Sequence, residues 1–242
     1  MPLTPLAARY DQFILDLDGC VWVGGEPTPG VVEALEEVRS AGKPFAFATN
    51  NAFESGEDLV AQPDAKPNGG AKRPQQALDA GATYDVVLET NCGDITIRLD
   101  QKASPRTAAS FASLAKSGFF DDTVFHRIVP GFVIQGGDPT GTGTGGPGYS
   151  TRDVPPRGVA YTKGVVAMAK TAAEPPGTAG SQFYIVTAPD AGLPPDYALL
   201  GKVVKGQAVA DAIGKLGDPA SGEAGTPLQP VVIERAAVRE HR

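Results

Sequence analysis

The stretch from Phe125 to Asp138 carries the side chains whose types and spacing most plainly suggest chemistry. Its two short apolar runs flank Pro130-Gly131, a turn dipeptide, which predicts two β-strands joined by a tight turn. Alternate side chains of a strand lie on one face, so Arg127, Phe132 and Gln135 could line a pocket with both polar and apolar groups. A core hairpin with one surface arginine fits the same residues equally well. This stretch alone leaves both interpretations open.

A second candidate site lies near the N-terminus. Asp16 and Asp18 end an apolar run, and the alternation of a strand places both carboxylates on the same side. Thr49-Asn50-Asn51 follows a second apolar run, and the amphipathic pattern of residues 28–39 between the two runs predicts a helix. The carboxyl ends of strands are where α/β sheets place their active sites. The pattern therefore predicts a β-α-β unit with polar groups at one end.

Composition limits the kinds of partner. The chain has 242 residues, enough for one or two domains with a proper core, and its formal net charge is −7. This balance favours neither nucleic acid nor an anionic membrane as a partner, and no apolar run reaches membrane-spanning length. Cys20 and Cys92 form neither a disulfide framework nor a zinc-binding spacing. The first residues do not have the pattern of a secretory signal, so we expect a cytoplasmic location.

The Asp16-Leu17-Asp18-Gly19 and Thr49-Asn50-Asn51 motifs resemble the first two motifs of haloacid-dehalogenase-type phosphatases, over about residues 10–51. The resemblance implies that Asp16 is a phosphoryl-accepting nucleophile, Asp18 an acid/base and Thr49 a phosphate ligand. Such chemistry also needs a lysine and an acidic pair that holds Mg²⁺, and neither motif follows Asn51. We therefore expect residues 1–51 to be a partial fragment without activity. A Mg-dependent phosphatase acting through Asp16 is an alternative.

The rest of the chain divides into a linker and a β-rich domain. Residues 52–83 are rich in Pro, Gly, Ala and charged residues, which predicts a mostly disordered, flexible linker that packs strongly on neither neighbour. Over residues 84–242 several short strand patterns alternate with turns, beginning with a hairpin at Asn91-Cys92-Gly93. Two amphipathic segments, 104–116 and 207–216, predict helices. We expect a mainly β fold, a closed antiparallel eight-stranded barrel capped by two helices.

Three blocks of this domain resemble the cyclophilins, the peptidyl-prolyl cis-trans isomerases. They are Phe125–Asp138, Gly180–Ile185 and Leu200–Val203, in the family's order and at suitable spacing, within a resemblance that covers about residues 84–240. The resemblance implies the cyclophilin-like barrel. It also implies an enzyme that accelerates rotation about Xaa-Pro bonds in proteins and assists protein folding, without a cofactor or metal.

The resemblance also assigns roles to individual residues. Arg127 would stabilise the twisted amide, with Phe132 and Gln135 completing the catalytic group. The substrate-binding residues it implies are Val133, Gly143, Ala169, Lys170, Gln182, Tyr184, Leu193 and Tyr197. Each apolar member of this set taken singly fits a core position at least as well, so the argument rests on the combination.

Three features depart from the family's pattern. Gly192 stands where a tryptophan is usual, Tyr197 stands where a histidine is usual, and the 169–180 loop is longer than usual. The missing indole donor implies weak or no cyclosporin binding. The expected partners are proline-containing peptides and unfolded or folding proteins, with the chain a monomer. The departures also keep open a proline-peptide-binding module with weak turnover.

Overall fold

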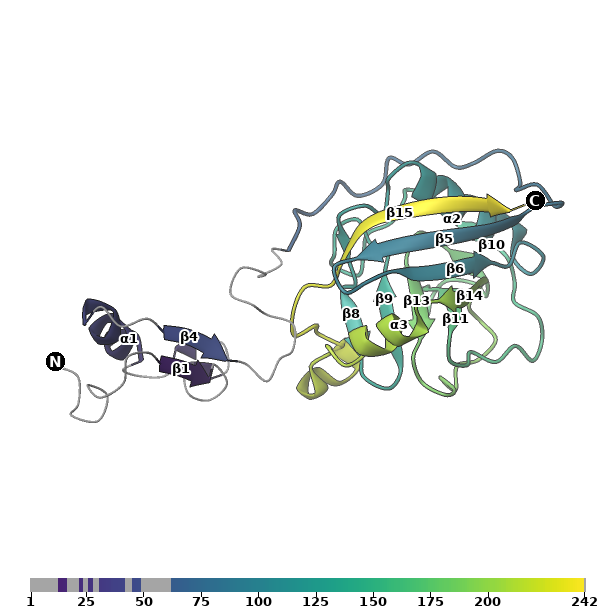
Figure 1. The fold of residues 1–242 in the computed structure, drawn as a ribbon. Helices are drawn as coiled ribbons and strands as arrows, with labels where there is room; N and C mark the ends of the chain where they lie inside the picture. Colours follow the sequence, from purple (N-terminus) through teal and green to yellow (C-terminus); the bar gives the residue numbers. More distant parts are fainter. Residues whose placement is uncertain are drawn as a thin grey trace. The chain divides into compact units, whose positions relative to one another are not determined.

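The chain forms two compact units, Met1–Leu59 and Val60–Arg242. The computed structural model describes residues 13–16, 22–23, 26–27, 31–41, 45–48 and 62–241. Figure 1 shows the elements of both units.

The first unit has the β-α-β order that the sequence predicts. Its elements are β1 (Phe13–Asp16), β2 (Trp22–Val23), β3 (Glu26–Pro27), α1 (Val31–Ser40) and β4 (Phe45–Ala48). β1 pairs in parallel with β4, and β2 pairs antiparallel with β3. Asp18 and Thr49 lie outside the described residues, as does the side chain of Asp16.

The second unit is mainly β. Its strands are β5 (Thr83–Thr90), β6 (Ile95–Leu99), β7 (Thr123–Val124), β8 (Arg127–Val129), β9 (Val133–Gly136), β10 (Thr151–Arg152), β11 (Val165–Met168), β12 (Thr178–Ala179), β13 (Phe183–Val186), β14 (Leu199–Lys205) and β15 (Val232–His241). The helices are α2 (Pro105–Lys116), α3 (Gln207–Ile213) and the 3₁₀ segment η2 (Pro219–Ala224). No helix in the described part of the chain is long and apolar enough to cross a membrane.

One curled sheet contains most of these strands, and it differs from the closed eight-stranded barrel that the pattern predicts. Nine strands are paired in the order β7-β15-β5-β6-β14-β11-β13-β9-β8, so β7 and β8 are the two edges of an open sheet. A single bridge between Val124 and Asp138 connects the β7 edge to the chain just after β9. The edge strands have only two and three residues, too few for a ladder that would close the barrel.

Local signals explain the hairpin and the first helix. Gly93 has φ of +115°, a backbone conformation that glycine adopts readily, in the turn between β5 and β6. α2 begins with Pro105, whose missing N–H costs nothing in the first turn, and Gly118 follows its end with φ of +70°. α3 ends at Ile213, three residues before the predicted end at Leu216.

The core of the sheet contains a cluster of four buried phenylalanines. Phe183 of β13 lies edge-on to Phe111 of α2 at 5.3 Å between ring centroids, to Phe120 at 6.1 Å and to Phe125 at 5.9 Å. Edge-to-face contacts of this kind stabilise an aromatic core. Because Phe125 is buried here, its neighbours in β8 are held against the same core.

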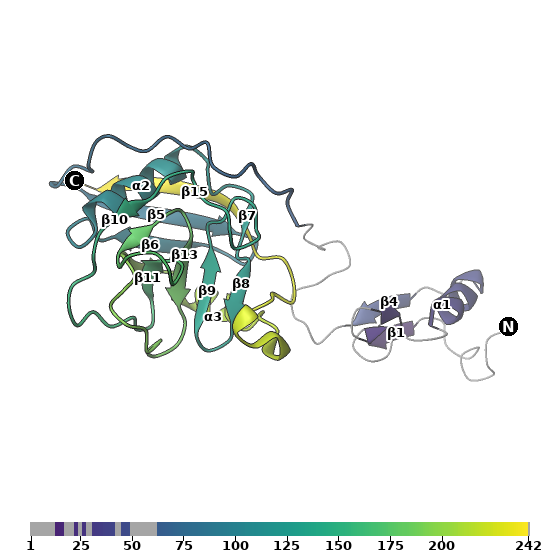
Figure 2. The same cartoon turned by 180° about the vertical axis from the view of Figure 1, so that it is seen from behind.

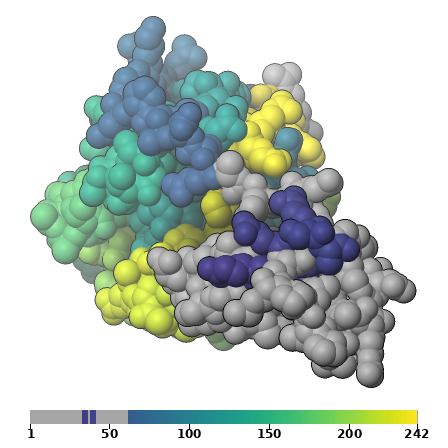
Figure 3. All heavy atoms as spheres, turned by 90° about the vertical axis from the view of Figure 1, so that its left-hand side faces the viewer, coloured from purple at the N-terminus to yellow at the C-terminus, as the bar shows by residue number. Residues whose placement is uncertain are grey.

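The second half of the predicted linker packs on the barrel. The segment 66–73, called the strap below, makes backbone hydrogen bonds to residues Pro139, Gly146 and Pro147. Figure 1 and Figure 2 show the strap on the side of the barrel that carries α2, and Figure 3 shows it in blue against the teal atoms of the barrel. The expectation that residues 52–83 pack strongly on neither neighbour is therefore wrong for the strap. Composition did not reveal the backbone partners that a distant loop provides.

Candidate functional site

A pocket of about 530 Å³ opens between β8, β9, β13 and the loop before β14. Arg127 and Gln135 contribute polar groups to its wall, and the other predicted site residues there are Phe132, Val133, Ala169, Lys170, Tyr184, Leu193 and Tyr197. Val129 and Glu223 complete the lining. The pairing of β8 with β9 and of β9 with β13 brings the separate sequence blocks together at this place.

The guanidinium of Arg127 is held from two sides. Its Nε donates to the carbonyl oxygen of Glu223 at 2.9 Å, and its Nη1 donates to Oε1 of Gln135 at 3.2 Å. Gly225, with φ of +65°, lies against the stem of Arg127, and a Cβ at that position would lie 2.9 Å from Cγ of Arg127. The charged group is therefore oriented before any ligand binds.

A chain of side-chain amides continues from Arg127. Gln135 donates from Nε2 to Oε1 of Gln182 at 3.1 Å. Gln182 in turn donates from Nε2 to the carbonyl oxygens of Gly143 and Gly145, each at 2.9 Å. Each amide has its oxygen and its nitrogen engaged, so the geometry of one member fixes the next.

A second hollow of about 410 Å³ adjoins the first and shares Gln135, Ala169 and Lys170 with it. Gly143 and Gln182, the two predicted residues that do not line the first pocket, line this one. All the site residues that the cyclophilin resemblance implies therefore lie along two adjoining hollows. The geometry suits a ligand with an apolar end and an extended polar chain.

Asp138, at the end of the stretch that begins with Phe125, organises the glycine-rich loop of this groove. Its side chain is buried and accepts hydrogen bonds from the N–H of Thr140 at 2.7 Å and of Gly145 at 3.0 Å. Burial opposes the charge of the carboxylate, but the hydrogen bonds from these amides and from the Thr140 hydroxyl hold the pKa of Asp138 below its usual value.

We expect the substitution Asp138→Asn to lower the free energy of unfolding at pH 7 by about 1–3 kcal/mol, because an amide nitrogen would face these N–H donors. The folded-state pKa lies below the unfolded value of about 3.9, so the carboxylate stabilises the fold above that value and loses this effect as the pH falls through the folded pKa. The difference in free energy of unfolding between the wild type and Asp138→Asn should therefore shrink as the pH falls below about 4. Urea unfolding at several pH values measures this difference. Asp94→Asn, at an exposed position, is the control and should show little change. A difference that grows on acidification would contradict the assignment.

Two tyrosines, Tyr184 and Tyr197, form the far wall of the first pocket. The rings of Tyr184 and Tyr197 meet edge to face with centroids 5.6 Å apart, and Tyr161 lies behind both of them. The hydroxyl of Tyr161 donates to the carbonyl oxygen of Tyr197 at 2.6 Å. The buried hydroxyl of Tyr184 has no hydrogen-bond partner among the described residues. Burial, and then the neighbouring tyrosines, raise the pKa of Tyr184.

We expect Tyr184→Phe to leave the free energy of unfolding unchanged or to raise it by about 1 kcal/mol, because the change removes a buried hydroxyl that no protein group satisfies. The ring that lines the pocket is kept, so catalytic efficiency should not fall. Tyr161→Phe is the matched control, and it should lower stability by about 1–2 kcal/mol because its hydroxyl is bonded. Urea unfolding measures the free energy of unfolding of both variants. A larger loss of stability for Tyr184→Phe than for Tyr161→Phe would contradict the prediction.

Lys170 lies in the wall of the first pocket, and Gly192 lies in the loop that carries the wall residue Leu193. The Lys170 side chain is only 4% exposed, and its ammonium lies 3.1 Å from Oδ2 of Asp196 and 5.5 Å from the ring centroid of Tyr197. Its charge is therefore neutralised within the wall. Gly192 has φ of +62°, and no atom lies within 4 Å of the position that a Cβ would take, whereas its neighbour Leu193 lines the pocket.

Sequence reasoning missed Glu223, Asp196 and Asn68. The carbonyl of Glu223 holds Arg127 across 96 residues of sequence, and no motif marks a backbone carbonyl. Asp196 holds Lys170, and Asn68 lines the second hollow from within the predicted linker. Within the described ranges no group of three or more His, Cys, Asp or Glu side chains could hold a metal ion.

Two family models match the chain. Residues 85–238 match the model described as cyclophilin type peptidyl-prolyl cis-trans isomerase/CLD, and residues 13–96 match that of haloacid dehalogenase-like hydrolases. Residues 85–96 belong to both matched ranges, and in the structure they contribute to β5, the hairpin turn and β6 of the large sheet.

Individual relatives agree with the larger match. The peptidyl-prolyl cis-trans isomerase CYP18-2 of Arabidopsis thaliana is 38% identical over 166 residues, which cover 67% of this chain and 98% of the relative. The peptidyl-prolyl cis-trans isomerase B of Streptomyces anulatus is 40% identical over 169 residues, 62% of this chain and 94% of the relative.

Solved structures show the same relationship. A crystal structure of a cyclophilin type peptidyl-prolyl cis-trans isomerase of Cryptosporidium parvum aligns with a TM-score of 0.58 at 30% identity, over 66% of this chain and 99% of that one. A second structure of that protein, in the presence of the dipeptide Ala-Pro, aligns with a TM-score of 0.57 at 30% identity, over 64% of this chain and 98% of that one. Most of the described sheet, the first pocket and every lining residue of the second hollow except Asn68 lie within residues 85–238, which is more than half of the chain. The chain therefore belongs to the cyclophilin-type peptidyl-prolyl cis-trans isomerases.

Proposed function

We propose that the 530 Å³ pocket binds the proline of an Xaa-Pro segment and that Arg127 accelerates rotation about the preceding amide bond. The observation that carries the proposal is the meeting of one oriented guanidinium with an apolar wall in a single pocket. The substrates would be proline-containing peptides and folding proteins, and the chain would act as a monomer.

The reaction needs no nucleophile. Rotation about an amide is opposed by a barrier of about 18–20 kcal/mol, because the nitrogen lone pair is delocalised into the carbonyl. In the twisted state the lone pair is localised on nitrogen, where it accepts a hydrogen bond better than in the planar state. A guanidinium directed at that nitrogen therefore binds the twisted state more tightly than the ground state, which is the condition for catalysis.

Arginine suits this role because it stays charged and presents several fixed donors. Two donors of Arg127 are used by Glu223 and Gln135, and Nη2 has no hydrogen-bond partner among the described residues, so it is available to a substrate nitrogen. An acceleration of 10⁵ would require a preference of only about 7 kcal/mol for the twisted state.

The apolar wall would hold the proline ring while the preceding carbonyl turns. Phe132, Val133 and Leu193 offer apolar surface, and Tyr184 and Tyr197 close the far side. Excluding water from the pocket strengthens the field of the guanidinium at the amide. Gln135 would contact the substrate backbone with its remaining N–H.

A solved relative supports a proline ligand. The Cryptosporidium parvum protein was crystallised in the presence of Ala-Pro, and we extend a ligand of this kind to the pocket of this chain. Weak or no binding of cyclosporin stays a prediction, based on the missing side chain at Gly192.

The direct test is NMR exchange spectroscopy on a peptide with one Xaa-Pro bond, with the full chain added at catalytic concentration. We expect exchange between the cis and trans signals, because uncatalysed rotation takes on the order of 10–100 s. Peptide binding without faster exchange would instead favour the module with weak turnover.

A further inference from the structure

The strap begins at an anchor that a loose linker would not form. The ammonium of Lys66 donates to three carbonyl oxygens, those of Gly118, Phe119 and Asp121, at 2.9, 3.1 and 2.7 Å. The backbone N–H of Lys66 also donates to the carbonyl of Pro139 at 2.8 Å. The three side-chain bonds satisfy the ammonium, and all four bonds fix the start of the strap beside the end of α2.

The middle of the strap bonds to the glycine-rich loop of the second hollow. Gly69 donates its N–H to the carbonyl of Gly146 at 2.9 Å, and the N–H of Gly146 donates to Oδ1 of Asn68 at 3.0 Å. The backbones of the strap and the loop approach so closely that a Cβ on Gly148 would lie 3.2 Å from Cα of Gly69. Glycine is needed on the loop side of this contact.

The end of the strap is fixed by an arginine and a tyrosine. The guanidinium of Arg73 lies over the ring of Tyr149 at 5.4 Å from its centroid and donates to the carbonyl of Ser150. The hydroxyl of Tyr149 is bonded to Oγ of Ser110 in α2 at 3.0 Å. The loop is therefore bonded to the strap on one side, while its Gly143 and Gly145 carbonyls hold Gln182 on the other.

Asn68 gives the strap a direct place in the groove. It lines the 410 Å³ hollow with Gly143, Gly145 and Gln182, and its side chain is exposed. Its Oδ1 is used by Gly146, whereas Nδ2 has no hydrogen-bond partner among the described residues. A free amide donor beside a groove is suited to the carbonyl oxygen of an extended peptide.

From this arrangement we propose that the strap is part of the peptide-binding site and that Asn68 recognises the backbone of substrate residues that flank the proline. This inference rests on the proposed function of the first pocket, which the second hollow adjoins. The functional domain then includes the strap and begins before residue 84. Asn68 is a specificity-determining residue, because only a substrate longer than the proline pocket reaches it.

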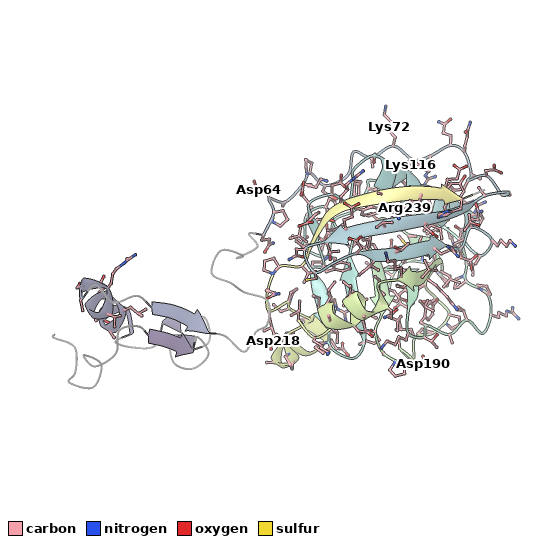
Figure 4. The ribbon with its side chains drawn as sticks, in the orientation of Figure 1. Asp64, Lys72, Lys116, Asp190, Asp218 and Arg239 are labelled. Atoms are coloured by element: carbon pink, nitrogen blue, oxygen red, sulfur yellow. The ribbon has the colours of Figure 1, made fainter. Side chains whose placement is uncertain are left out.

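Full-chain variants test this role with two substitutions at one position. Asn68→Asp keeps an oxygen that accepts from Gly146 but replaces the free donor with an acceptor, whereas Asn68→Ala removes both. Lys72→Ala is the control, because Lys72 belongs to the strap and projects away from the barrel (Figure 4), and it has no hydrogen bond or ion pair among the described residues. Each protein is assayed on a short Xaa-Pro peptide and on two longer peptides, one extended before the proline and one after it.

We expect both Asn68 variants to raise KM by roughly three- to tenfold for one of the extended peptides and to leave kcat unchanged, because a ground-state contact is lost while Arg127 is not disturbed. The short peptide and Lys72→Ala should match the wild type. Thermal unfolding separates the structural role of Asn68 from its role in substrate binding. Asn68→Asp keeps the acceptor for Gly146, so its melting temperature should lie closer to that of the wild type than that of Asn68→Ala.

Unchanged KM for every peptide in Asn68→Asp and Asn68→Ala would overturn the inference, and so would an equal loss on short and extended peptides. Failure of the proposed function has a different result, namely that the wild-type chain does not accelerate exchange in any of the three peptides.

Discussion

Replacing Arg127 with alanine is expected to lower kcat/KM for prolyl isomerisation by roughly 10²–10³, the range seen when one donor to a transition state is removed. The substrate pocket keeps its apolar wall, so KM should change much less than kcat. The fold should persist, because Arg127 lies half-buried at the rim and its partners are a carbonyl and the amide of Gln135. Exchange NMR measures the rate, and circular dichroism with thermal unfolding measures the fold.

Two further variants make this test specific. Arg127→Lys keeps the charge but loses the fixed donors, so an activity between those of alanine and arginine is expected. Arg235→Ala removes an exposed arginine from β15, outside both hollows, and should leave activity unchanged. If Arg127→Ala retains nearly full activity, the catalytic assignment of this residue is wrong.

The second large effect is expected at Gly137, which directly follows β9, the strand that carries Gln135, and lies against Ser181 and Phe183 at the start of β13. Gly137 has φ of +84°, and a Cβ there would overlap the carbonyl oxygen of Ser181 and lie 2.9 Å from Cδ1 of Phe183. Gly137→Ala should therefore lower the free energy of unfolding by about 2–5 kcal/mol, from backbone strain and overpacking together. Moving β9 away from β13 would also displace Gln135 from Gln182, so catalytic efficiency should fall in the folded fraction.

Gly131→Ala separates the two causes. Gly131 has a similar φ of +69°, but no atom lies within 4 Å of the position that a Cβ would take. This variant should show only the strain of the left-handed backbone, about 1–2 kcal/mol. Urea unfolding of both variants measures the difference, and equal losses would show that the contact with Ser181 is not the cause.

Features that depend on neighbours in sequence were predictable. The turn at Asn91-Cys92-Gly93 and the limits of α2 follow from glycine and proline conformations, which act over a few residues. The family was predictable as well, because its motifs are short and contiguous, and the match over residues 85–238 confirms it. The two hollows contain the residues that these motifs indicated, whereas the catalytic roles stay predictions.

Other features were decided by contacts between distant parts of the chain. Closure of the sheet depends on how short edge strands meet after the sheet curls, and the alternating pattern of a strand carries no information about its partner. The strap has the composition of a linker, yet it is held by backbone groups of a loop more than 70 residues away. Backbone donors and acceptors are the same in every residue type, so such contacts leave no mark on composition.

The stretch from Phe125 to Asp138 has features of both kinds, some set by neighbouring residues and some set by distant parts of the chain. Its residue types alone specified two strands, a tight turn and the family's signature, because these follow from local geometry. Only the folded chain brought the carbonyl of Glu223 to Arg127, Gln182 to Gln135 and the amide of Gly145 to Asp138. Catalysis of the proposed kind depends on fixed donor directions, and the directions at Arg127 and Gln135 are set by contacts between residues far apart in the sequence.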